Sequence, residues 1–125
     1  MQSVVVVGAI DGDTIVLSSG EYVRLIGVDT PELDQPGSLV ATQFVKNRVE
    51  GRTVWLEPDG ADQDRYDRLR RYVWLRKPTD SQDENQIRQY MLNALLLSNR
   101  HAKVSIVGDV KNGALFRRLE QEAWQ

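Results

Sequence analysis

The chain has 125 residues, a formal net charge of −2 and no cysteine. This length is typical of one domain, so we expect a single domain over residues 1–125. The absence of cysteine excludes disulfides, zinc–thiolate sites and thiol nucleophiles, and the single histidine, His101, excludes a metal site with several histidine ligands. The slightly acidic balance argues against tight non-specific binding of nucleic acid, which a basic excess favours.

The strands are predicted from apolar, mainly β-branched runs bounded by turn residues. Asp11 and Gly12 indicate a tight turn after the first run. We expect a meander of five strands that closes into a small barrel. Its strands are predicted at residues 4–10, 14–17, 21–28, 53–57 and 69–75.

Two helices are predicted from apolar residues at helical spacing. The first begins with Ser38 as its N-cap and ends before Gly51. The second follows a capping box of Ser81 and Glu84, and its apolar period continues over residues 87–97. Because its apolar stripe is the widest in the chain, we expect it to be the most buried helix.

A third helix is predicted over residues 114–123, with Leu115, Leu119 and Trp124 as its apolar anchors. This order of strands and helices predicts the α+β class. No apolar run approaches the ~20 residues that span a membrane. No signal peptide is visible, so the sequence leaves open a cytoplasmic protein or a mature domain whose leader was removed.

Three short stretches interleave carboxylates with arginines, at residues 11–14, 24–32 and 64–68. Carboxylate oxygens bind a hard cation, and arginine binds phosphate through two parallel contacts. Cleavage of a phosphodiester uses both, because negative charge accumulates on the phosphoryl oxygens. The pattern therefore favours a metal-dependent phosphodiesterase.

These stretches, their order and the predicted helix between them resemble the staphylococcal nuclease-like (thermonuclease) family. The resemblance implies an OB-type five-stranded β-barrel with three α-helices. It also implies calcium-dependent hydrolysis of DNA and RNA that leaves 3′-phosphate products. We expect no membrane partner and a monomer.

The resemblance also implies which residues bind calcium and substrate. The implied calcium ligands are the carboxylates of Asp13 and Asp29 and the backbone carbonyl of Thr30. Arg65 and Tyr66 match positions near the terminal phosphate of a bound nucleotide. Calcium accepts such an all-oxygen set and leaves room for water and a phosphate oxygen.

The catalytic residues implied by the resemblance are Arg24, Arg68 and Glu32. Arg24 and Arg68 match the two phosphate-binding arginines, and Glu32 matches a glutamate often assigned as the base that activates water. Fixed donors of this kind stabilise charge that develops in the transition state.

The chain departs from the family pattern at three positions. Asp67 stands where the best-known member has glycine, and we expect it either to pair with Arg65 or Arg70 or to weaken phosphate attraction. Ile106 and Gly108 replace aromatic residues that usually wall the nucleotide base. We therefore expect weaker nucleotide affinity or a rearranged base pocket.

Each stretch alone is typical of a turn, a loop or a surface ion pair. The alternative function is a noncatalytic module that binds nucleic acid or protein on the same scaffold. A third possibility is a small structural OB domain that binds protein partners and no metal.

Overall fold

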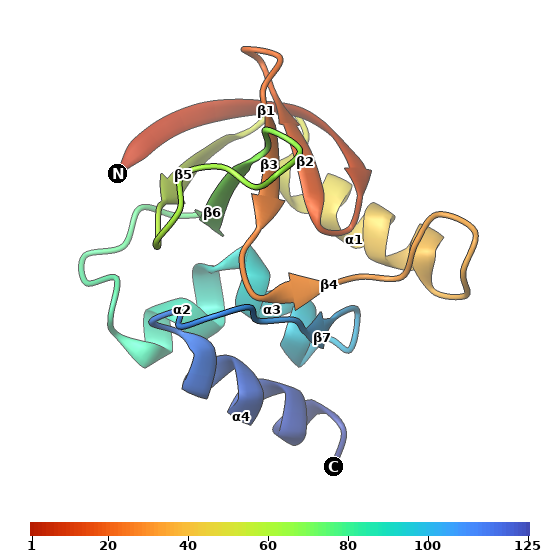
Figure 1. Ribbon diagram of the computed structural model, residues 1–125, viewed down its shortest axis with the longest axis vertical. Coiled ribbons are helices and arrows are strands. Elements are labelled where there is room, and N and C mark those ends of the chain that lie inside the picture. Colours follow the sequence, from red (N-terminus) through yellow and green to blue (C-terminus); the bar gives the residue numbers. More distant parts are fainter.

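The computed structural model describes residues 1–125, which form seven strands and four helices (Figure 1). The strands are β1 (Gln2–Asp11), β2 (Thr14–Leu17), β3 (Tyr22–Leu25), β4 (Val28–Asp29), β5 (Thr53–Glu57), β6 (Leu69–Trp74) and β7 (Lys103–Val104). The helices are α1 (Ser38–Val49), α2 (Glu84–Tyr90), α3 (Leu92–Ser98) and α4 (Gly113–Ala123).

Five of the strands close into a barrel in the order β1-β2-β3-β6-β5. The expected α+β class and the OB-type five-stranded barrel are therefore confirmed. The predicted meander is wrong, because β3 and β6 pair in parallel, with Val23 opposite Leu69 and Leu25 opposite Arg71. In a meander all neighbouring strands run antiparallel. Along the chain, α1 and β5 lie between β3 and β6. This connection allows the chain to enter β6 in the same direction as β3.

The predicted strand at residues 21–28 is divided into β3 and β4. Gly27 lies at the break with a φ of 80°, a conformation that side chains disfavour. A Cβ atom at Gly27 would lie 2.8 Å from Cδ2 of Phe116 in α4, so the position also needs glycine for close packing. The break directs β4 away from the barrel to pair with β7, which places Asp29 opposite Lys103.

The helix predicted over residues 87–97 is divided as well, so the structure has four helices where three were expected. Met91 interrupts it with extended dihedral angles (φ −89°, ψ 118°) and forms an isolated bridge with Trp74 of β6. Helical spacing continues across this residue, so the sequence pattern did not reveal the break.

Both predicted N-caps are wrong. Gly37 is the N-cap of α1, and Ser38 is the first helical residue, with its buried Oγ unpaired. Asp83 caps α2 in place of Ser81, because its carboxylate accepts a hydrogen bond from the backbone N–H of Asn85 at 3.0 Å. The start of each helix contains more than one residue that can act as an N-cap. The spacing in the sequence alone therefore did not identify the correct one.

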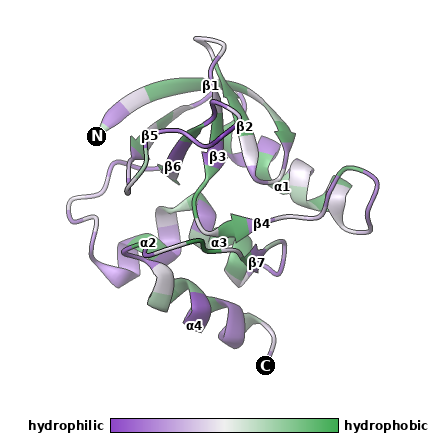
Figure 2. Ribbon diagram, viewed as in Figure 1, coloured by the Kyte–Doolittle hydropathy of each residue, from purple (hydrophilic) through white to green (hydrophobic).

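The core fills the barrel and continues between the barrel and the helices below it, where α3 contains apolar segments (Figure 2). Asn93 of α3 is a fully buried polar residue in this layer. Trp124, predicted as an anchor, is 60% exposed, whereas Leu115 and Leu119 are buried as expected. None of the four helices combines the length and the apolar composition of a membrane-spanning segment.

Candidate active site

The charged residues of the three sequence stretches meet beside β2, β3 and β4. Asp13 immediately precedes β2, Arg24 lies on β3, and Asp29 ends β4. Arg68 immediately precedes β6, which lies next to β3 in the barrel. The parallel pairing of β3 with β6 therefore brings a distant arginine to the same end of the barrel as the first two stretches.

Asp13 lies at the centre of this group and is only 5% exposed. Its Oδ2 accepts hydrogen bonds from the backbone N–H and the hydroxyl of Thr30, at 2.9 and 3.1 Å. Its Oδ1 accepts a hydrogen bond from the hydroxyl of Thr14 at 3.2 Å. Burial alone would raise the pKa of Asp13, but the charge of Arg24, a hydrogen bond with Asp11 and the two hydrogen bonds from Thr30 outweigh it and lower the pKa. Asp13 is therefore a fixed carboxylate.

Arg24 lies between Asp13 and Asp29. Its Nη1 donates to the carbonyls of Leu25 and Val28, at 2.9 and 2.6 Å, across the break between β3 and β4. Its Nη2 lies 3.3 Å from Oδ1 of Asp29 and 3.7 Å from Oδ2 of Asp13. One guanidinium thus contacts both carboxylates and is held in place by backbone carbonyls.

Arg68 is fixed from the other side of Asp13. Its Nε donates to Oδ2 of Asp64 at 2.7 Å, and its Nη1 lies 3.4 Å from the hydroxyl of Thr14. Since Thr14 donates to Asp13, a continuous hydrogen-bond chain joins the second guanidinium to the same carboxylate. The two arginines therefore flank Asp13.

Sequence reasoning assigned no role to Thr14 or Asp64, which hold this arrangement together. Oδ1 of Asp64 accepts hydrogen bonds from the backbone N–H groups of Tyr66 and Arg68, at 2.9 and 3.0 Å. Asp64 thereby closes the loop that carries Arg68. Its position four residues before Arg68 was the available signal, because an aspartate at such a turn bonds to the backbone that follows it.

Two further carboxylates crowd Asp13. Burial, together with Asp13, raises the pKa of Asp11 to about 6. Burial likewise raises the pKa of Asp29, against the attraction of Arg24, and both Asp13 and Glu32 raise it further. The site therefore holds more negative charge than Arg24 neutralises.

The donor chemistry of this group fits a hard cation. Asp13 and Asp29 present carboxylate oxygens, and the carbonyl oxygen of Thr30 accepts no hydrogen bond within the chain. No three acidic or histidine side chains gather closely enough to hold a metal ion by themselves. A cation here would bind two carboxylates and a carbonyl and take its other ligands from water or substrate, as calcium commonly does.

The three remaining predicted residues are exposed at the edge of the site. Glu32 lies in the loop after Pro31, and its carboxylate makes no hydrogen bond or ion pair, although it is near enough to Asp29 to raise its pKa. The guanidinium groups of Arg65 and Arg68 lie 5.0 and 5.3 Å from the ring centroid of Tyr66. Arg65 and Arg68 therefore place two positive charges beside the ring of Tyr66 on one loop.

The three departures from the family pattern fall outside the central group. Asp67 forms none of the ion pairs, so the expected pairing with Arg65 or Arg70 is not observed. It instead adopts a left-handed backbone conformation with a φ of 61°. Ile106 is half-buried towards Gly113, and Gly108 is exposed, so neither provides a wall for a base.

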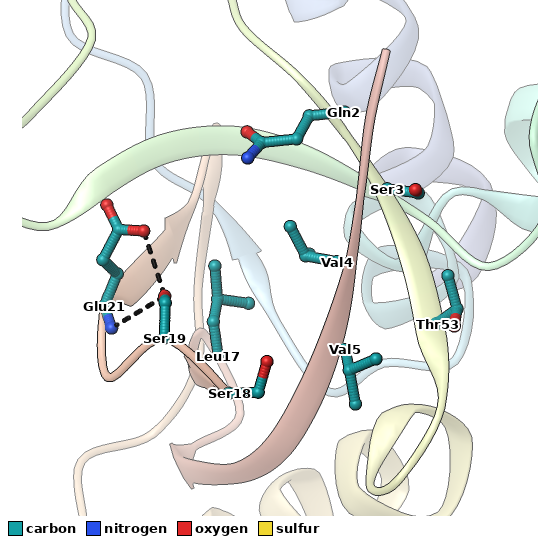
Figure 3. A pocket seen from close by; sticks show the side chains of 9 residues that line it. All are labelled: Gln2, Ser3, Val4, Val5, Leu17, Ser18, Ser19, Glu21 and Thr53. Carbon is teal, nitrogen blue, oxygen red and sulfur yellow. Dashed lines mark hydrogen bonds between the residues drawn. The ribbon is translucent and has the colours of Figure 1, made fainter.

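Two of the six hollows on the surface differ in their lining. One, of about 600 Å³, begins at Asp29 and Thr30 and extends to Trp124. The other, of about 320 Å³, lies between β1, β5 and the turn after β2 (Figure 3). Glu21 is the one charged residue lining it, and Ser19 holds that carboxylate at 3.0 Å. Only the first hollow adjoins the charged group.

Comparisons with known proteins find a matching family and similar curated proteins. A family model described as "Staphylococcal nuclease homologue" matches residues 22–125. The thermonuclease of Staphylococcus hyicus is 40% identical over 85 residues, and that of Staphylococcus intermedius is 42% identical over 83 residues. These alignments cover 61% and 59% of this chain and 50% and 49% of the relatives. The chain thus spans about half the length of the curated relatives it matches.

Proposed function

The chain belongs to the staphylococcal nuclease homologue family, and from this premise we propose that it is a calcium-dependent nuclease acting on DNA and RNA. The proposed reaction hydrolyses phosphodiester bonds and leaves 3′-phosphate products. One observation carries the proposal: Arg24 and Arg68 flank Asp13, and Arg24 also contacts Asp29. Two fixed guanidinium groups beside clustered carboxylates suit a phosphate bound next to a cation.

Asp13, Asp29 and the carbonyl of Thr30 would hold the calcium ion. When bound, the ion offsets the crowded negative charge and polarises the phosphoryl group. Asp13 needs little rearrangement for this role, because Thr14 and Thr30 already fix its carboxylate. An all-oxygen donor set of this kind is the one calcium prefers.

Arg24 and Arg68 would stabilise the charge that develops as water attacks phosphorus and the bond to the 5′ oxygen breaks. Nη2 of Arg68 donates no hydrogen bond within the chain, so it is free to bind a phosphate oxygen. The unpaired carboxylate of Glu32 would take the proton of the attacking water. Arg65 and Tyr66 would bind the terminal phosphate from the adjacent loop.

The proposal is tested by the release of acid-soluble nucleotides from DNA and RNA, with calcium and with chelator. Arg24→Ala and Arg68→Ala should each lower the rate on the order of 10²–10³-fold, because each removes a fixed donor. Glu32→Gln should lower it ~10²–10⁴-fold through loss of the base. Arg76→Ala is the control, since this exposed arginine contacts only Tyr90.

Equal activity of all four variants would contradict the assignment of the site. Binding of oligonucleotides without turnover, under any divalent metal, would instead favour the noncatalytic module. That outcome would leave the family and the fold unchanged.

A further inference from the structure

The hollow beside Asp29 is a cleft formed by three separate parts of the chain. One wall is the segment between β4 and α1, including Pro31 and Pro36, together with Val40 of α1. The opposite wall is the turn between α3 and β7, and Trp124 after α4 completes it. Its volume of about 600 Å³ lies within the range of sites that take a nucleotide-sized ligand.

The cleft is positively charged although the chain is acidic overall. Arg100 and Lys103 line it and form none of the ion pairs of the molecule. Asp29 is the only acid in its lining, and Arg24 already contacts that carboxylate. His101 adds no charge at neutral pH, because burial and the nearby Arg48 lower its pKa.

An open aromatic surface lies at the far end of the cleft. Trp124 is 60% exposed, and the guanidinium carbon of Arg100 lies 5.3 Å from the centroid of its ring. Nε of Arg100 also donates a hydrogen bond to the carbonyl of Ala123, which fixes the guanidinium beside the indole. The turn after α3 therefore holds a positive charge against an exposed ring.

The backbone of Arg100 adopts a conformation that is unfavourable for a residue with a side chain. It follows the C-cap Asn99 with a φ of 64°, where helices usually place glycine. A non-glycine residue is disfavoured there, so the arrangement is not explained by local backbone preference. The Arg100 side chain at this position contributes a positive charge that contacts the ring of Trp124.

We propose that this cleft is a stacking subsite for single-stranded nucleic acid next to the candidate active site. An unpaired base would stack on Trp124 and Arg100, and a neighbouring phosphate would contact Lys103. The strand would then pass Asp29 and Thr30 into the charged group. The proposal deepens the proposed function and rests on it, since it assigns a further binding subsite to the substrate of that site.

The lining distinguishes single strands from other ligands. Exposed aromatic and cationic side chains bind unpaired bases in any sequence, because every base has a stacking face. A duplex hides these faces, because its bases are paired and stacked inside the double helix. The subsite would also supply stacking that Ile106 and Gly108 do not provide.

Binding is tested without turnover, by titrating labelled oligothymidylate and oligouridylate of eight nucleotides in chelator at low salt. Trp124→Leu should weaken binding about fivefold or more, which is the lower limit for the loss of one stacked base. Trp124→Phe should retain most of the affinity, because it keeps an aromatic face. Trp55, half-buried on the barrel, offers the matched control Trp55→Phe.

The charge contribution is tested with Lys103→Ala against the control Lys77→Ala, an exposed lysine in a distant loop. Loss of a phosphate contact at Lys103 should reduce the salt dependence of binding by about one counterion, and Lys77→Ala should leave it unchanged. A hairpin duplex of equal charge should compete poorly with the single strands.

Three results would overturn the subsite. The first is unchanged affinity in both Trp124→Leu and Lys103→Ala. The second is equal binding of duplex and single strand, and the third is no binding of the wild-type chain at low salt. Binding that depends on Trp124 in a protein that shows no turnover with calcium would support the subsite and reject the proposed catalysis, so the two failures are distinguishable.

Discussion

At the scale of single residues, two side chains sit on backbone that glycine usually occupies. Asp67 and Arg100 both have positive φ values, 61° and 64°. Asp67 lies in the loop that carries Arg65 and Arg68, and Arg100 lies in the cleft wall. Both positions border the surfaces to which we assign binding, where strained backbone is commonly found.

Asp67→Gly should raise the free energy of unfolding, by up to about 1 kcal/mol. Glycine adopts the left-handed conformation without the Cβ clash, and its extra freedom in the unfolded chain offsets part of the gain. Urea unfolding measures the change. Asp34→Gly is the control, since Asp34 is exposed and has no positive φ. A destabilised Asp67→Gly would show that the Asp67 side chain stabilises the loop.

Asp11→Asn should raise the melting temperature above pH 6 and leave it unchanged below pH 4, in chelator. The folded chain raises the pKa of Asp11 to about 6 from its usual 3.8, so it binds this proton more tightly than the unfolded chain. The resulting stability is complete below pH ~4 and is lost as the pH rises through about 6. Asparagine keeps the acceptor for the N–H of Asp13 without the charge.

The matched control for this pH series is Asp80→Asn, because Asp80 accepts a similar local bond from the N–H of Gln82 at 2.9 Å on the surface. Its melting temperature should differ little from that of the wild type at every pH. Identical pH profiles for Asp11→Asn and the wild type would show that ionisation of Asp11 does not destabilise the folded chain.

At the scale of elements, one buried side chain joins α3 to the end of the barrel. Nδ2 of Asn93 donates to the carbonyl of Ile26 at 2.9 Å, and its Oδ1 accepts from the N–H of Val73 at 2.9 Å. Ile26 directly follows β3, and Val73 lies on β6. Asn93 therefore supports the parallel pair on which Arg24 and Arg68 depend.

Asn93→Ala should lower the free energy of unfolding by about 2–4 kcal/mol, because it leaves a buried N–H and a buried carbonyl without partners. Denaturant unfolding measures this loss. Asn99→Ala is the control, since Asn99 bonds only to the carbonyl of Leu95 on the surface. Losses of equal size in the two variants would mean that the buried contacts add nothing to stability.

The same elements show what the sequence could predict. Apolar, mainly β-branched runs correctly predicted β1, β2, β5 and β6, because the pattern that indicates a strand is local in the sequence. The parallel partner of β3 was missed, since strand pairing depends on contacts distant in sequence. The breaks at Gly27 and Met91 were missed for a related reason: Phe116 and Trp74, which accompany them, lie far along the chain.

For the candidate site, the resemblance supplied residues that the structure brings together, such as Asp13, Arg24 and Arg68. It could not supply the residues that hold them, because Thr14 acts through a bond to a side chain 54 positions away. Trp124 was taken for a core residue, since an apolar residue at helical spacing does not reveal whether another element covers it.

At the scale of the whole molecule, a ligand that binds only the folded state raises its stability. Calcium should therefore raise the melting temperature at pH 7.5, with a gain of about 2.7 kcal/mol at a concentration 100 times its Kd. Thermal melting with and without calcium measures the difference within each variant. Asp13→Asn and Asp29→Asn should reduce it, and Asp80→Asn should retain it. A calcium effect of the same size in all three would place the bound ion elsewhere.

The hydrogen bond between Thr14 and Arg68 also has a consequence for biosynthesis. The two residues are 54 positions apart, and the second guanidinium reaches Asp13 only through this contact. A nascent polypeptide that has not yet emerged past β6 has just one of the two arginines near that carboxylate. The charge cluster is therefore incomplete until more than half of the chain has left the ribosome.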